Sequence, residues 1–297
     1  MGERVLQGKE KYPPDEGGVA SRSTQRRRQL SSETVDLDGR SFGMSLRSSP
    51  LLLLGLGLAS SGGARAERVE PMSTRVAVIV ELFSSEGCSS CPPADRVVDR
   101  LDTTQPIDGV EVVAMEEHVD YWNRLGWTDP FSSAVFSTRQ QWYAGALQSN
   151  GVYTPQAIVD GQRELNGTDA RLLEEAIAAA ARRPHARLDL AREPGRVRVT
   201  VRELPAGAGA TVLWLALVES GLSTDVSRGE NGGRTLRHSP IVRELRRIGP
   251  AHVGDRFAAA IEPPIAWRRD HLRVVVFAQE TSTARILGAA TLSLGRP

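Results

Sequence analysis

The most restrictive feature of this 297-residue chain is a change in its hydrophobic period near residue 185. Before that point, short β-branched runs alternate with segments whose apolar residues recur at helical spacing, which predicts alternating strands and helices. After it, apolar and polar residues alternate with a period of two, and no strong helical segment intervenes. The sequence therefore predicts an α/β domain over about residues 67–184 and a small antiparallel β-sandwich domain over about residues 185–297.

The composition argues against a membrane and against nucleic acid as partners of this protein. Apolar residues make up 40% of the chain and charged residues 25%, which is typical of a globular protein. No apolar run reaches the roughly 18 residues of a spanning helix, so we expect no stable membrane insertion. Residues 67–297 carry 27 arginines against 29 acidic residues, which argues against nucleic acid as a partner.

The first 66 residues have the pattern of a targeting segment rather than that of a folded domain. Residues 1–43 are polar and charge-rich, so we expect them to be disordered, as an extension that is not native coding sequence. Residues 44–66 have the three parts of a secretory signal peptide: the basic Arg47, an apolar segment, and a small-residue cleavage motif that ends at Ala66. The alternative is a core or anchor helix. Cleavage would place residues 67–297 in the periplasm or outside the cell, where disulfides form.

Both cysteines of the chain belong to one C-x-x-C motif, Cys88-Ser89-Ser90-Cys91. The motif follows the β-branched run at residues 75–82 and precedes a segment with helical spacing, so it lies between a strand and a helix start. Free amides and the dipole at a helix start stabilise a thiolate. This context predicts Cys88 as the accessible, attacking thiolate and Cys91 as the more buried resolving thiol.

Three other roles for the cysteines stay open. They could form a purely structural disulfide, although so short a loop removes little entropy from the unfolded chain. They could bind a metal, with copper(I) held by both thiols and His118 as the best form, but the histidines are scattered and no second C-x-x-C exists. They could also be unrelated free thiols. Compartment, spacing and helix-start context together favour thiol–disulfide exchange, with no metal and no dissociable cofactor.

Four separated motifs extend this pattern across residues 75–297, namely ELFSSEGCSSCPPAD, HVDYWNRLGWTDPF, VYTPQAIVDG and RGENGGRTLRHSPIVRELRRIGP. Together they resemble a family of uncharacterised exported thioredoxin-like proteins of Gram-negative bacteria. The thioredoxin superfamily implies that Pro155 is a cis-proline that faces the dithiol. It also implies that the backbone of Thr154 pairs with an extended substrate chain.

Two ionisable residues could support the cysteines. The resemblance implies that Glu81, in an otherwise apolar run, is a buried carboxylate that moves protons for the inner cysteine; the alternative is a glutamate at the strand end in solvent. His118 follows the predicted strand at residues 110–115, where Glu116 and Glu117 end the apolar run. It could act as a second base at the dithiol or be a structural histidine.

Two further groups allow a functional and a structural interpretation. The aromatic residues of the segment after His118 could form the floor of a peptide groove or simply pack in the core: Trp122, Trp127, Phe131 and Trp142. The polar loop at residues 228–238 could bind an anion or the first domain, or be a solvated surface.

The function that the sequence favours is an exported thiol–disulfide oxidoreductase acting on a protein or on a small thiol or disulfide compound. The alternative is a non-catalytic binding module of the same fold, in which the disulfide formed by Cys88 and Cys91 is structural.

Overall fold

The computed structural model describes residues 75–238 and 240–295, so the predictions for residues 1–66 lie outside the described residues. The fold is mixed α/β, and strands predominate. The helices are α1 (Cys91–Thr104), α2 (Ala134–Ala146) and α3 (Ala170–Ala181), with short 3-10 turns η1 (Asn123–Leu125) and η2 (Arg269–His271). The strands are β1 (Val76–Ser84), β2 (Val110–His118), β3 (Gln156–Val159), β4 (Arg163–Asn166), β5 (Arg187–Glu193), β6 (Arg196–Glu203), β7 (Thr211–Glu219), β8 (Leu222–Val226), β9 (Arg234–His238), β10 (Ile241–Pro250), β11 (Arg256–Ala260), β12 (Leu272–Glu280) and β13 (Ile286–Ser293). In the described part of the chain, no helix combines the length and the hydropathy that crossing a membrane requires.

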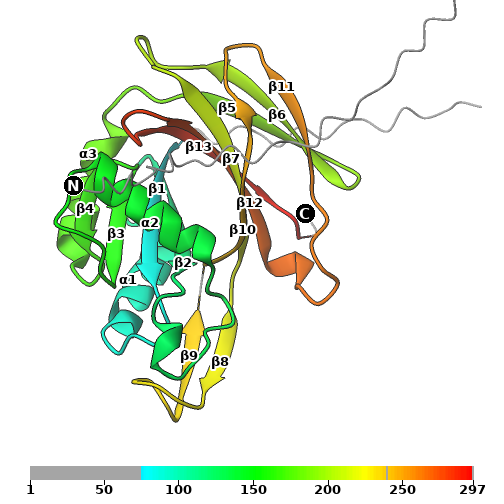
Figure 1. Cartoon of the computed structure of the whole chain (residues 1–297). Coiled ribbons are helices and arrows are strands. Elements are labelled where there is room, and N and C mark those ends of the chain that lie inside the picture. Colours follow the sequence, from blue (N-terminus) through cyan, green and yellow to red (C-terminus); the bar gives the residue numbers. More distant parts are fainter. Residues whose placement is uncertain (1–74, 239, 296–297) are drawn as a thin grey trace, which may run out of the picture. The chain divides into compact units, whose positions relative to one another are not determined.

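One eight-stranded sheet contains strands from both parts of the sequence, in the order β13-β12-β7-β10-β2-β1-β3-β4 (Figure 1). The parallel pairs are β1 with β2 and β10 with β2, and the other neighbours are antiparallel. The two parts of the sequence join where Ile241 pairs with Glu116, whose amide donates to the carbonyl of Pro240 at 2.8 Å. The domain boundary near residue 184 stays a prediction, but the strands on either side of it share this sheet.

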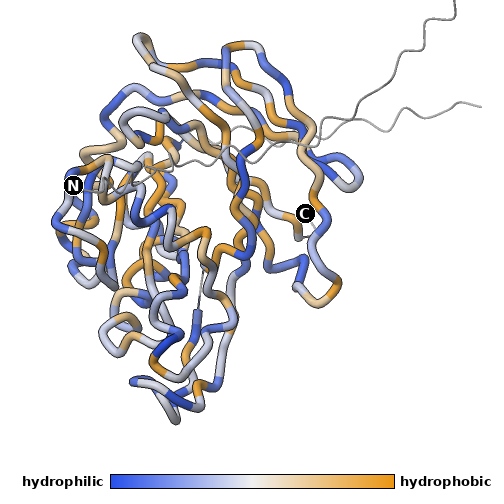
Figure 2. Tube along the Cα trace, in the orientation of Figure 1, coloured by the Kyte–Doolittle hydropathy of each residue, from blue (hydrophilic) through white to orange (hydrophobic). Residues whose placement is uncertain are grey.

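Different helices pack on the two faces of β1 and β2. Val78, Val80 and Leu82 pack with α1 and α3, whereas Ile79 and the odd-numbered residues of β2 pack toward α2. This division follows from the strand period of two. Burial on both faces explains the unbroken apolar run of β1, and Figure 2 shows hydrophobic residues concentrated along these strands.

The strands after residue 185 add a second layer and a hairpin. A three-stranded sheet, β11-β6-β5, packs against one face of β7 and β12 through a core that includes Val199, Leu215 and Val276. The hairpin of β8 and β9 forms a separate two-stranded sheet, and β9 contacts α1. The second part of the sequence therefore supplies both a sheet layer and a segment next to the C-x-x-C helix.

Candidate functional site

The two cysteines form a disulfide where the chain leaves β1 and enters α1. A turn in which the amide of Cys88 donates to the carbonyl of Ser85 at 3.1 Å precedes the helix, and Cys91 is its first residue. Pro92 and Pro93 follow in the first turn, so two amides that could have stabilised a thiolate are missing. The hydroxyl of Ser90 is 3.3 Å from the Cys88 sulfur. The predicted strand, turn and helix order around the motif is confirmed.

The disulfide is buried, which corrects the expectation that Cys88 is accessible. Both cysteines have an exposed fraction of 0%, although Ser89 and Ser90 between them are exposed. We infer that the loop between β8 and β9 is the cover, because it is hydrogen-bonded to the backbone of Glu86, Cys88 and Ser89. Asn231, itself fully buried, donates through its side-chain amide to the carbonyls of Glu86 and Cys88, each at 2.9 Å.

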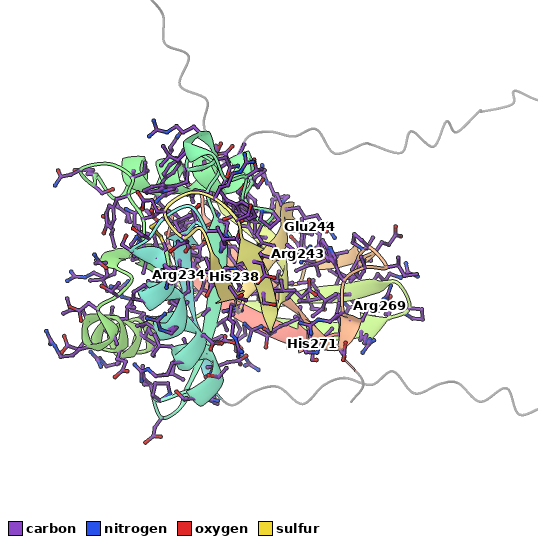
Figure 3. The ribbon with its side chains drawn as sticks, turned by 90° about the horizontal axis from the view of Figure 1, so that it is seen from below. Arg234, His238, Arg243, Glu244, Arg269 and His271 are labelled. Atoms are coloured by element: carbon purple, nitrogen blue, oxygen red, sulfur yellow. A yellow bond between two sulfur atoms is a disulfide. The ribbon has the colours of Figure 1, made fainter. Side chains whose placement is uncertain are left out.

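Two more contacts hold the cover in place. Glu230 accepts hydrogen bonds from the amide of Ser89 at 3.0 Å and from its hydroxyl at 2.7 Å. Arg234 donates to the side-chain oxygen of Asn231 at 2.7 Å, and Figure 3 shows Arg234 and His238 together on β9. The polar loop at residues 228–238 therefore contacts the first part of the chain, which is one of the roles that the sequence suggests for it.

Thr154 and Pro155 lie near the same turn. The peptide bond between them is cis, as the resemblance implies. The indole of Trp122 donates to the hydroxyl of Thr154 at 2.9 Å, and a Cβ on Gly87 would meet the Trp122 Cβ at 3.1 Å. Trp122 thus connects the residue before Cys88 to the residue before the proline, which makes it part of the site rather than only of the core.

Glu81 is buried, but not in the role that the sequence suggests. Its carboxylate accepts hydrogen bonds from Arg139 and from the hydroxyl of Tyr143, both on α2. Because side chains alternate along a strand, Glu81 faces α2, on the face of the sheet opposite α1. Glu117 joins the same group, 3.6 Å from Arg139. This geometry contradicts a proton relay from Glu81 to Cys91, because the sheet separates Glu81 from the helix that begins at Cys91.

His118 belongs to a buried cluster that the sequence did not predict. The strand β2 continues through Glu116 and Glu117 to His118, and all three are buried. The Nδ1 of His118 lies 2.7 Å from a carboxylate oxygen of Asp129, and the Nε2 of His238 lies 2.9 Å from Glu86.

The two imidazole rings are in edge contact, with centroids 5.2 Å apart, and Phe131 contacts both. Glu116, His118 and His238 each bring a potential metal ligand atom within 4.8 Å of the others. The sequence signal was weak because His238 is distant from β2 along the chain.

Burial and neighbouring charges shift the pKa values in this cluster. Burial raises the pKa of Glu116 well above its usual value, and Asp95 adds to the effect. Burial alone would lower the pKa of His118, but the Asp129 carboxylate outweighs it and the net shift is upward. Burial acts to raise the pKa of Asp129, yet His118 and backbone amides lower it overall. The pair of His118 and Asp129 is therefore mutually stabilised in the charged form.

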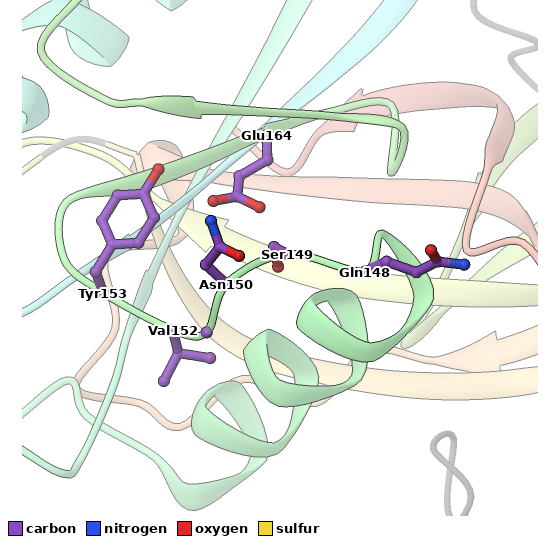
Figure 4. Close-up of a pocket in the computed structure, with 7 residues that line it drawn as sticks. Gln148, Ser149, Asn150, Val152, Tyr153 and Glu164 are labelled. Atoms are coloured by element: carbon purple, nitrogen blue, oxygen red, sulfur yellow. The ribbon is translucent and has the colours of Figure 1, made fainter.

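The other aromatic residues have mixed roles. The indole of Trp127 donates to Glu86 at 2.7 Å, and Trp142 packs against Tyr143. A surface pocket of about 410 Å³ lies between the end of α2 and β4, and its polar lining includes Tyr153 and Glu164 (Figure 4). None of the residues predicted for the site lines this pocket.

Comparison with known proteins gives a family and a fold. The X-ray structure of an Agrobacterium tumefaciens protein is 29% identical, covers 75% of this chain and 96% of that chain, and has a TM-score of 0.61. HBP35 of Porphyromonas gingivalis is 14% identical, covers 74% of this chain and 76% of that chain, and has a TM-score of 0.49. No curated protein matches. Residues 79–279, more than half of the chain, match the model of the family described as "Protein of unknown function (DUF1223)", and the chain therefore belongs to that family.

Proposed function

We propose that this protein is an exported thiol–disulfide oxidoreductase whose redox group is the disulfide between Cys88 and Cys91. The observation that carries the proposal is the position of this disulfide at the junction of a buried strand and a helix, in a turn that Trp122 connects to Thr154. Residues 44–66 support the location, because their pattern is that of a signal peptide and a periplasmic or secreted protein can keep a disulfide.

The strand order supports a thioredoxin-like first part. β1 lies between the parallel β2 and the antiparallel β3, and β4 follows at the edge. Helices α1 and α3 pack on one face and α2 on the other. For the second part, the packing of β11-β6-β5 on β7 and β12 supports a small sandwich.

The reaction needs only thiols and a disulfide. A substrate thiolate attacks the Cys88 sulfur, the bond to Cys91 breaks, and Cys91 leaves as a thiolate that takes up a proton. A second substrate thiolate then attacks the mixed disulfide and releases Cys88. The substrate dithiol loses two electrons and becomes a disulfide, while Cys88 and Cys91 gain them and become thiols.

A specific observation favours a second candidate function. Both cysteines are buried and Asn231 bonds the carbonyl of Cys88, as expected for a structural disulfide in a binding module. The first candidate requires the loop between β8 and β9 to move aside when substrate binds. Local opening of this kind is ordinary for loops with few apolar contacts.

Equilibration of the full chain with glutathione buffers of graded potential tests the proposal. We expect the disulfide to exchange with a reduction potential above about −300 mV, and Cys91→Ser to accumulate a mixed disulfide at Cys88. The double variant Cys88→Ser/Cys91→Ser should unfold at nearly the same urea concentration as the oxidised protein.

A structural disulfide gives the opposite pattern. It resists glutathione in the folded protein, and the double serine variant loses about 2 kcal/mol of stability, the loop-closure contribution for so short a loop. The variant Ser282→Ala is the control, since it changes an exposed serine far along the chain from the cysteines and leaves both sulfurs and the loop between β8 and β9 in place.

A further inference from the structure

The cluster formed by Glu116, His118 and His238 has a feature that neither a redox site nor an ordinary core explains. Both carboxylate oxygens of Glu116, the Nε2 of His118 and the Nδ1 of His238 are buried and have no hydrogen-bond partner. The closest approach between His118 and Glu116 is 4.0 Å, beyond hydrogen-bond distance. Buried polar atoms are rarely left unpaired, so four of them directed at one another require an explanation.

The second nitrogen of each imidazole indicates which atom is free to bind. Asp129 accepts from the Nδ1 of His118, and Glu86 accepts from the Nε2 of His238. Those two bonds place an N–H on one nitrogen of each ring, and the other nitrogens are the ones without a partner. A cation would bind at these nitrogens and replace any proton that His118 holds there. A carboxylate that fixes the tautomer of a histidine in this way is the usual support of a metal-binding histidine.

The carboxylates are themselves held in place. Asp129 also accepts from the amides of Glu86 and Phe131, at 2.8 and 2.9 Å. Glu86 also accepts from the indole of Trp127. The two imidazoles are therefore held by groups on two separate segments, the turn after β1 and the loop at residues 127–131, which orients both free nitrogens before any ligand arrives.

We propose that Glu116, His118 and His238 bind a divalent transition-metal cation, with Zn²⁺ as the ion that best suits the donor set. Two imidazole nitrogens and one carboxylate are a common three-ligand set for zinc, and they leave a fourth position for water or substrate. The cluster also lies among buried carboxyl groups, namely Glu86, Asp95 and Asp129, which would favour a cation over an anion as its ligand.

The proposed site is distinct from the disulfide but lies next to it. Ser84, which pairs with His118 across the strands, donates to Asp95 on α1 at 2.7 Å, and α1 begins at Cys91. His238 belongs to the hairpin whose loop covers Cys88. A bound cation would therefore tie the hairpin to β2 and hold the cover over the disulfide.

The test uses the full chain with its disulfide intact, Zn²⁺ in calorimetric titration and Co²⁺ as a spectroscopic substitute. We expect one equivalent of Zn²⁺ to bind and Co²⁺ to give the visible absorption of a low-coordinate nitrogen and oxygen site. Glu116→Gln and His238→Gln should each weaken binding more than 100-fold. Asp129→Asn, which removes the charge that supports His118 and one of the two acceptor oxygens but no proposed ligand, should weaken it 10- to 100-fold.

Controls separate the site from other ligands and from misfolding. His252→Gln changes an exposed histidine that also has a carboxylate partner, Asp255, and should leave Zn²⁺ affinity unchanged. The double variant Cys88→Ser/Cys91→Ser should bind Zn²⁺ normally. Circular dichroism on the metal-free variants checks that each is folded.

Three outcomes would overturn the proposal. They are the absence of saturable binding of Zn²⁺ or Co²⁺ by the folded wild type, full affinity in Glu116→Gln and His238→Gln, and loss of binding in the cysteine variant. The first would mean that a proton shared between Glu116 and His118 takes the place of the cation. The third would show that binding depends on the disulfide rather than on these three residues. None of them bears on whether the disulfide exchanges with glutathione.

Discussion

The two faces of β1 and β2 both contain buried acidic groups, but they compensate them differently. On the face toward α2, Glu81 and Glu117 lie against Arg139, which also bonds the hydroxyl of Tyr143 at 2.8 Å. On the face toward α1, Glu116 lies beside two imidazoles whose facing nitrogens have no hydrogen-bond partner. The first group contains Arg139 as its cation, although both oxygens of Glu117 also lack a hydrogen-bond partner, and in the second group four atoms lack one.

The way in which the charges are compensated distinguishes a stabilising group from a ligand-binding group, whereas burial does not. Every member of both groups is almost fully buried, so exposure does not distinguish them. Glu81 is satisfied by Arg139 and Tyr143, which the fold itself supplies, whereas the atoms of the second group stay unpaired until a proton or a cation lies between them. The face toward α1 is therefore where we expect ligand chemistry, and the face toward α2 is where we expect stability.

The largest expected effect is on stability, and it concerns the face of β1 and β2 that lies toward α2. Arg139→Met removes the cation between Glu81 and Glu117 and leaves two buried carboxyl groups without it. Breaking a buried ion pair by removing one partner costs about 3 to 5 kcal/mol, so we expect a loss of that size in the free energy of unfolding by urea.

The matched control for that experiment is Arg171→Met on the exposed face of α3. Its ion pair with Glu175 is 72% and 58% exposed, and its removal should change stability by less than about 0.5 kcal/mol. Equal effects of the two substitutions would show that the buried group on the α2 face contributes no special stability.

Another buried carboxyl group, that of Asp160, extends the comparison. Protonation, rather than an arginine or a bound cation, removes its charge. Asp160 follows β3 and accepts from the amide of Ile79 at 2.8 Å, and burial raises its pKa to about 7. The folded-state pKa lies above the unfolded one, so its contribution to stability is fully present below about pH 4 and is lost as the pH rises through 7. Asp160→Asn should therefore stabilise the protein by on the order of 3 kcal/mol at pH 8 and have little effect at pH 4.

Asparagine suits this position because the residue has a φ of 45°, a conformation that asparagine tolerates. Urea unfolding of the variant and the wild type from pH 4 to pH 8 measures the effect, and Asp108→Asn at an exposed position is the control. Parallel stability curves for wild type and Asp160→Asn would mean that this carboxyl does not take up a proton on folding.

The smallest expected effect concerns the cover on the α1 face. Asn231→Ala removes two hydrogen bonds to the carbonyls of Glu86 and Cys88, worth about 2 kcal/mol together. If the loop opens before a reductant reaches the sulfurs, reduction by dithiothreitol should become roughly 10- to 30-fold faster.

Alkylation and mass spectrometry follow the reduction over time, with Asn150→Ala at an exposed loop as the control. An unchanged rate would mean that the reductant reaches the sulfurs by another route.

Much of the fold could be predicted because local patterns determine it. The apolar run of β1, the prolines after Cys91 and the stripe on α3 all have the spacing of their elements, and Asp169 caps α3 by accepting from the amide of Leu172 at 3.0 Å. The eight-stranded sheet shared by both parts of the sequence was not predicted. It depends on one short parallel contact between β10 and β2, and hydrophobic period does not reveal which strand becomes the neighbour of another.

The site was predicted only where the residues are close in sequence. The strand, turn and C-x-x-C helix are local, and the disulfide between Cys88 and Cys91 is present. The burial of the sulfurs was missed because the cover comes from a hairpin far along the chain. Glu116 ended an apolar run and therefore suggested the end of a strand. In the structure it is an interior residue of β2, and its role becomes visible only once His238 lies beside it.

The sulfurs and the loop that covers them are far apart along the chain. This separation determines which of them is synthesised first. Asn231 lies 143 residues after Cys88, so a ribosome completes the C-x-x-C turn long before it makes the loop that closes over it. During that interval the thiols are open to any oxidant that the emerging chain meets. The covalent bond can therefore form first and be covered afterwards, when the hairpin of β8 and β9 has been made and β10 pairs with β2.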